Sequence, residues 1–241
     1  MEIDRRVLSA GQKQQASQAK PDRWSAVPGG QRVQMAGATA RIPAMDDGAQ
    51  LLLAGEDERA VGEGASGDSK KKRVKSGKAE SPSYGIIDSQ SVKTIYASEE
   101  RGYDGGKKVK GRKHHIVVDT LGNLLAVKVH AANIHDTKSG IGPAMRAYEK
   151  YPTIERFCGD EGYRKSFEED VANRLSLGVD ISARISLVFE VLSKRWVVER
   201  SFGWMGNSRR LSKDYEIATD SAETMIIISH LHTLLRNLAA A

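Results

Sequence analysis

Short apolar runs alternate with amphipathic segments from Tyr84 onward, and their order leaves few folds open. Apolar runs bounded by turn residues predict buried strands, whereas apolar residues spaced by three and four predict helices. In chain order, the pattern predicts a strand at 84–88, two strands within 114–133 joined by a turn at 119–123, a helix at 136–150, a strand at 154–158, a helix at about 166–176, a strand within 179–192, a helix at 195–211 and a last helix from 220.

Local signals mark the ends and the buried faces of the helices. Asp136 is expected to cap the first helix, and Asp220 with Glu223 has the spacing of a capping box for the last one. Trp196 and Trp204 are predicted to pack the 195–211 helix on the sheet. An apolar stripe is expected to turn the last helix toward the core, through Met225, Ile228, Leu231, Leu235 and Leu238.

The predicted order is strand-strand-strand-helix-strand-helix-strand-helix. This is the order of a ribonuclease H-like α/β sheet, in which the first strand is central and neighbours the fourth. We therefore expect a mixed sheet of about five strands flanked by helices.

The first 80 residues differ in texture from the rest. Trp24 is their one aromatic residue out of 14 in the chain, and Leu, Ile, Val and Phe make up only 11 of the 80. Such a segment buries too little apolar surface to offset the entropy of ordering. We predict a largely disordered extension over 1–80 and a catalytic domain over 81–241. The basic run at 70–78 is interpreted as a solvated linker, with a non-specific DNA-binding arm as the alternative.

Basic charge gathers in two stretches of a chain whose net charge is +6. Residues 101–113 and 194–213 each hold six basic side chains and a single acidic one. Basic stripes of this kind favour a phosphate backbone as partner, although two solvated loops would look the same. No apolar run is long enough to span a bilayer, and the single Cys158 suits a reducing cytosol.

Three acidic residues fall at positions where this fold would bring them together. Asp88 ends the first predicted strand, Asp160 ends the fourth, and Glu199 lies one turn into the helix after the fifth. Carboxylates packed together repel one another unless a cation neutralises them, and their hard oxygens suit Mg²⁺ or Mn²⁺. Taken singly, Asp88 could be a strand-end cap, Asp160 a turn residue, and Glu199 an ion-pair partner of Arg195.

Four segments then resemble one family. They are GIIDSQSVKT (85–94), the stretch from RGYDGGKKVKGRKHHIVVDT to the following glycine (101–122), GDEGYRKSF (159–167) and RWVVERSFGWMGNSRRLSKDYE (195–216). Together they resemble the DDE-class transposases of bacterial insertion sequences over roughly 81–238. The resemblance implies a ribonuclease H-like fold, with Asp88, Asp160 and Glu199 as ligands of two Mg²⁺ or Mn²⁺ ions. It also implies metal-dependent DNA cleavage and strand transfer, by a homo-oligomer on DNA in the bacterial cytoplasm, at the nucleoid.

The sequence departs from the wider class in two respects. Arg195 and Glu199 match its pattern around the third acid, but Leu192 stands where a tyrosine is usual and Gly206 where a lysine is usual. Residues 1–68 lack the tryptophan-rich helical pattern expected ahead of the first aspartate. Their composition favours a truncated or frame-shifted N-terminal region, so a catalytically incompetent remnant that only binds DNA stays open as an alternative.

The basic residues of the two stretches are the predicted DNA contacts. His114 and His115, at the start of a strand, are expected to be structural or to contact phosphate rather than to bind metal. The residues predicted to bind DNA are Lys107, Lys108, Lys110, Arg112, Lys113, Arg195, Arg209, Arg210 and Lys213.

Overall fold

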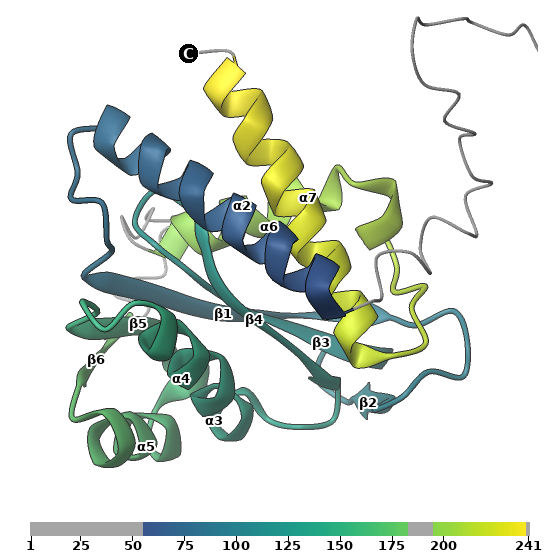
Figure 1. Ribbon diagram of the computed structural model, residues 1–241. Coiled ribbons are helices and arrows are strands. Elements are labelled where there is room, and N and C mark those ends of the chain that lie inside the picture. Colours follow the sequence, from purple (N-terminus) through teal and green to yellow (C-terminus); the bar gives the residue numbers. More distant parts are fainter. Residues whose placement is uncertain (1–54, 183–194, 240–241) are drawn as a thin grey trace, which may run out of the picture. The chain divides into compact units, whose positions relative to one another are not determined.

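The computed structural model describes residues 55–182 and 195–239, all within one unit of the chain, Pro43–Ala241 (Figure 1). Predictions for residues 1–54, and for any part of the fifth strand beyond residue 182, lie outside the described residues.

A six-stranded mixed sheet forms the centre of the described structure. Its strands are β1 (Tyr84–Lys93), β2 (Gly102–Asp104), β3 (Val109–Val118), β4 (Leu124–Ala131), β5 (Arg156–Asp160) and β6 (Gly178–Ser182). β1 lies between an antiparallel β3 and a parallel β5, and β6 continues the sheet parallel to β5, while β4 and the short β2 both pair with β3. The predicted central first strand, next to the fourth predicted strand, is confirmed. This is a ribonuclease H-like sheet.

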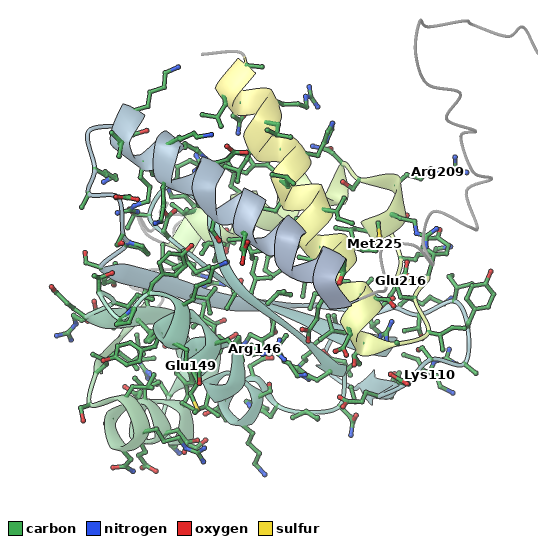
Figure 2. All side chains as sticks on the ribbon, in the orientation of Figure 1. Lys110, Arg146, Glu149, Arg209, Glu216 and Met225 are labelled. Carbon is green, nitrogen blue, oxygen red and sulfur yellow. The ribbon has the colours of Figure 1, made fainter. Side chains whose placement is uncertain are left out.

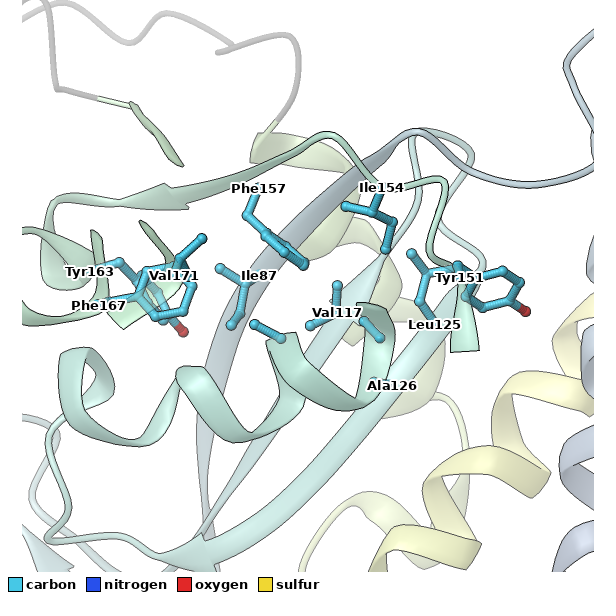
Figure 3. Close-up of a cluster of buried hydrophobic side chains, with 12 residues drawn as sticks. Ile87, Val117, Leu125, Ala126, Tyr151, Ile154, Phe157, Tyr163, Phe167 and Val171 are labelled. Atoms are coloured by element: carbon cyan, nitrogen blue, oxygen red, sulfur yellow. The ribbon is translucent and has the colours of Figure 1, made fainter. Parts of the chain in front are cut away.

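Helices cover both faces of the sheet (Figure 1). Because side chains alternate along a strand, Ile87 and Ile86 enter two different cores. Ile87 packs with residues of α4 (Ile141–Lys150) and α5 (Ser166–Leu175), in the cluster drawn in Figure 3. Ile86 packs with residues of α6 (Arg195–Gly206) and α7 (Thr219–Ala239). Within the described residues, the other helical elements are α2 (Gly55–Lys75), α3 (Asp136–Ser139) and the 3₁₀ turns Glu161–Tyr163 and Arg209–Leu211.

The prediction of disorder was wrong for residues 55–75, which form α2 along α7. Ala65, Ser69 and Arg73 are buried, although the helix has no pronounced apolar face. Its basic run is not a free linker either. Arg73 Nη1 lies 2.7 Å from the buried carboxylate of Asp119, and its other nitrogens donate to backbone carbonyls. The sequence pattern missed this helix because small residues and one buried ion pair, rather than large apolar side chains, make its contacts.

The predicted caps of two helices were also wrong. His135 caps α3 through its ring, and Asp136 instead accepts hydrogen bonds from Ser89 of β1 and Lys113 of β3. Glu223 does not cap α7, which begins four residues earlier, at Thr219. Its buried carboxylate accepts from the backbone N–H of Val129, at 2.9 Å, and from Arg146. In both cases the carboxylate binds residues distant in sequence rather than the backbone N–H groups at the start of its own helix.

The buried face of α7 differs from the predicted apolar stripe. Leu235 is half-exposed, and the other members of that stripe are only partly buried. The buried positions are Ala222, Glu223, Thr224, Ile226, Ser229, His230 and Leu234. Small and polar residues face inward because α7 lies close against both β4 and α2, where there is no room for a row of large side chains. No helix in the described ranges is long and apolar enough to cross a membrane.

Candidate metal and DNA site

The register of β1 and β5 brings the two aspartates side by side. Ile86 pairs with Cys158, so the same offset places Asp88 opposite Asp160. Both lie on the face that α6 covers, because alternate residues of a strand share a face. β5 ends at Asp160, whose carboxylate accepts a hydrogen bond from Gly162 N at 2.8 Å and so begins the following 3₁₀ turn. β1 runs on past Asp88 to Lys93, further than the sequence predicted.

The surroundings of Asp88 disfavour the ionised form of its carboxyl group. Burial and the nearby charge of Asp160 raise its pKa to about 6, against a hydrogen bond from Ser89 N and the positive charges of Arg195 and Lys107, which lower it. The hydrogen bond from Ser89 N and the nearby positive charges therefore do not fully offset burial and the charge of Asp160. A further cation beside them would lower the pKa of Asp88.

Glu199 is linked to Asp160 through Arg195, whose guanidinium lies close to both carboxylates. Arg195 and Glu199 lie one turn apart on α6, so both side chains leave the same side of the helix. The guanidinium Nε of Arg195 is 3.2 Å from Glu199 Oε1, although the angle is too poor for a hydrogen bond, and its Nη2 is 3.8 Å from Asp160 Oδ2. Arg195 therefore stands between two of the three predicted acids and partly neutralises both.

The predicted meeting of three acids is incomplete in this structure. Among residues 55–182 and 195–239, no three histidine, cysteine or acidic side chains lie together in a way that would hold a metal ion. The donor chemistry nevertheless fits a hard divalent cation, because the neighbouring groups are carboxylates and a guanidinium already lies between two of them. Glu199, more than half exposed, would have to turn from Arg195 toward the aspartates.

Two of the predicted DNA contacts were wrong. Arg112 is fully buried, and its guanidinium donates to both carboxylate oxygens of Asp214, at 2.7 and 2.6 Å. Lys113 is also buried, and its ammonium group donates to Asp136 and to the carbonyl of Ile134. Because both side chains are buried and bound to partners within the protein, neither is accessible to DNA.

Six other predicted DNA contacts are exposed. Lys107, Lys108 and Lys110 lie on and beside the turn between β2 and β3, and Lys107 Nζ is 3.3 Å from the carbonyl of Ser89, next to Asp88. The second group, Arg209, Arg210 and Lys213, follows α6. Figure 2 shows Arg209 and Lys110 toward the same end of the domain. Asp214 anchors the second group, since Arg112 and His114 both bind its carboxylate.

A buried polar cluster behind Asp88 was not foreseen. Ser89 points to the opposite face from Asp88 and donates to Asp136, at 2.7 Å. On that face the hydroxyl of Tyr163 shares a 2.5 Å hydrogen bond with His115 Nε2. Burial, with the nearby His130, lowers the pKa of His115 to about 3, so the ring is neutral and structural. Tyr163 thereby ties the turn after Asp160 to β3, and the buried tyrosine is visible in Figure 3.

A ribonuclease H-like sheet with aspartates in register on its central strand and on the neighbouring strand defines the class of domain. Residues 80–235 match the family described as "Transposase DDE domain", and the chain belongs to that family. It is 30% identical over 119 residues to a proposed transposase for insertion sequence element IS402 from Burkholderia cepacia. That match covers 46% of this chain and 56% of the relative, so it spans little more than half of the relative's length.

Two solved structures were found to be similar over about 60% of this chain. The catalytic core domain of BIV integrase is similar with a TM-score of 0.37 and 10% identity, over 60% of this chain and 81% of that one. The HTLV-2 integrase catalytic core domain, solved in complex with magnesium, has a TM-score of 0.36 and 18% identity, over 63% and 84%. The family membership rests on the sequence match.

Proposed function

We propose that this chain is an insertion-sequence transposase that cuts and joins DNA in the presence of Mg²⁺ or Mn²⁺. The observation that carries the proposal is the register of β1 and β5, which places Asp88 beside Asp160, with Arg195 joining Asp160 to Glu199. In the proposed reaction water hydrolyses a phosphodiester at the element's end. The freed 3′-hydroxyl then attacks a phosphodiester of the target strand and displaces one of its oxygens.

Asp88, Asp160 and Glu199 would hold the divalent ions, two as we propose. Such ions supply charge stabilisation at the attacking and leaving oxygens of an in-line displacement at phosphorus. Arg195 partly neutralises Asp160 and Glu199 in this structure and would contact a DNA phosphate beside them. The pKa of Asp88, about 6, leaves this carboxylate ionised above neutral pH and available as a ligand.

The exposed basic residues would bind the DNA. Lys107, Lys108 and Lys110 on one side, and Arg209, Arg210 and Lys213 on the other, would contact phosphates without reading sequence. Such contacts make the affinity fall steeply with salt concentration. We propose that the protein acts as a homo-oligomer, because joining both ends of an element needs two active sites, and that it acts at the nucleoid in the cytoplasm.

Substitution of one ligand tests the proposal directly. Asp88→Asn keeps the size of the side chain and removes its charge, so we expect Mg²⁺-dependent nicking to fall by at least about 100-fold. Binding to DNA in EDTA should change by less than about threefold. Asp170→Asn on α5, which removes a carboxylate away from the site, is the matched control and should nick like the wild type. Equal nicking by Asp88→Asn and the wild type contradicts the assignment.

A DNA-binding remnant without catalysis is the second candidate, favoured by the incomplete cluster of acids and by Arg195 between two of them. Mn²⁺ thermal shift separates the two, because a ligand that binds the folded state raises the melting temperature by mass action. No Mn²⁺ shift and no nicking would favour the remnant. A pre-cut donor end supplied with a target plasmid distinguishes a transposase from a nuclease, since only the former yields joined product.

A further inference from the structure

The three sides of α6 have different partners. Successive residues of a helix are about 100° apart, so positions four apart form a stripe. Val197, Val198, Ser201 and Met205 make up the buried side against the sheet. Arg195 and Glu199 form a stripe on one flank, toward Asp160. The stripe of Trp196, Arg200 and Trp204 lies on the other flank.

On that second flank the guanidinium of Arg200 lies between two indole rings. Its Cζ is 4.1 Å from the ring centroid of Trp196 and 4.5 Å from that of Trp204. Its Nη2 donates to the carbonyl of Leu121, at 3.4 Å. The prediction that both tryptophans pack on the sheet is therefore wrong, and Trp196 is 40% exposed. A planar cation held on both faces can adopt few orientations.

The turn whose carbonyl accepts from Arg200 is itself held by several hydrogen bonds to Asp119. Asp119 accepts from the backbone N–H groups of Leu121 and Asn123, at 2.8 and 2.9 Å, and also binds Arg73 of α2, at 2.7 Å. Gly122 has a φ of +81°, and a Cβ there would lie 3.0 Å from Ser201 Oγ and 3.3 Å from Trp204. The turn thus contacts α6 without space between them. Lys72 of α2 adds a cation 5.6 Å from the ring of Trp204.

The side chains of α6 that face the sheet are mostly small or apolar. Hydrophobic packing of such side chains is not directional. A rotation of α6 by about 30° would preserve much of that packing. It would move a side-chain end by about 2–3 Å at the radius that helical side chains reach. Displacements of this size at reacting groups are expensive for catalysis. The two stacking contacts lie within α6 and orient the guanidinium of Arg200. Its directional hydrogen bond to the carbonyl of Leu121, outside the helix, opposes such a rotation.

We propose that Arg200 is a positioning residue for Glu199. Held between Trp196 and Trp204 and bonded to the turn at Leu121, it fixes the rotation of α6 and so directs Glu199 toward Asp160. This inference rests on the proposed function, because it gives Glu199 a metal to bind.

The first readout is metal affinity, measured without DNA. In a Mn²⁺ thermal-shift titration, we expect Arg200→Met to raise the concentration for half-maximal stabilisation by about tenfold. Arg200→Lys keeps the charge but loses the planar group, and should behave like Arg200→Met. Nicking should fall by about 10- to 100-fold in both variants, with less than a threefold change in DNA binding in EDTA. Arg174→Met, an exposed arginine on α5, is the matched control and should keep wild-type Mn²⁺ affinity.

The outcomes separate the two proposals. If the wild type shows no Mn²⁺ shift, or Asp88→Asn shifts as much as the wild type, the proposed function fails. If these two behave as expected but both Arg200 variants keep wild-type Mn²⁺ affinity, only the positioning role is overturned. Loss of DNA binding in Arg200→Met with rescue by Arg200→Lys would likewise overturn it, because Arg200 would then be a phosphate contact. Should Arg200→Met not fold, Trp196→Ala decides, since it removes one face of the stack at the surface.

Discussion

At the scale of single residues, the two faces of β1 carry different polar groups. Asp88 faces the candidate site, while its neighbour Ser89 begins a buried polar cluster with Asp136 and Lys113. Tyr163 and His115 extend the cluster behind the turn that carries Asp160. Polar groups in such a place must be paired, because an unpaired buried donor or acceptor is costly.

Tyr163→Phe tests this cluster. The ring still fills its place, but His115 Nε2 loses its partner, so we expect the free energy of unfolding to fall by about 1–3 kcal/mol. Urea denaturation at pH 7 measures the loss. Tyr103→Phe removes the hydroxyl of a tyrosine that is 56% exposed and should change the stability by less than about 0.5 kcal/mol. Equal effects of the two substitutions would contradict a structural role for the Tyr163 hydroxyl.

At the scale of elements, α6 combines a tightly held flank with an open outer side. Its stripe of Trp196, Arg200 and Trp204 is fixed against the turn between β3 and β4. On the outer side, a Cβ added at Gly203 would meet nothing within 4 Å. A glycine inside a helix costs stability because its backbone loses more freedom on folding than that of alanine.

Gly203→Ala should therefore stabilise the protein by about 1 kcal/mol, seen as a higher melting temperature without metal. Gly111 gives the opposite case. A Cβ there would lie 1.9 Å from the carbonyl oxygen of Val92 in the neighbouring strand, so Gly111→Ala should destabilise the sheet strongly. If Gly203→Ala lowered the melting temperature, the outer side of α6 would not be open.

At the scale of the whole described structure, three helices from distant parts of the sequence meet the turn between β3 and β4. α2 supplies Arg73, α6 supplies Arg200, and α7 supplies His230, whose Nε2 accepts from Leu124 N at 3.0 Å. That hydrogen bond requires a neutral ring. Burial lowers the pKa of His230 to about 4, and the charge of Lys72 lowers it further than Asp119 raises it.

The pKa of His230 predicts acid sensitivity. It lies below the usual value of about 6.5, so the unfolded chain takes up the proton first. The stabilisation is complete above about pH 6.5 and is lost as the pH falls toward 4. The difference between the pKa of His230 in the unfolded chain and in the folded protein corresponds to about 3 kcal/mol of folding free energy. We expect urea denaturation between pH 7 and pH 4 to show a smaller loss of stability in His230→Gln than in the wild type. His232→Gln, exposed on the same helix, should follow the wild type.

The sequence by itself determined the order of the longer strands and the central place of the first one, beside the strand that ends at Asp160. These follow from short-range patterns, because alternation and turn residues select strands and their ends. The family also followed from local segments, and the match over 80–235 confirmed it.

Only the tertiary structure decided which basic side chains are exposed and which are buried in ion pairs. Arg112 and Lys108 look alike in a basic stretch, but Arg112 is buried against Asp214, 102 residues away, whereas Lys108 lies in an exposed turn. The buried stripe of α7 and the helix at 55–75 depend in the same way on partners distant in sequence. A charged or small residue becomes internal only when a distant segment supplies its ion pair or its close contact, and no local pattern records that partner.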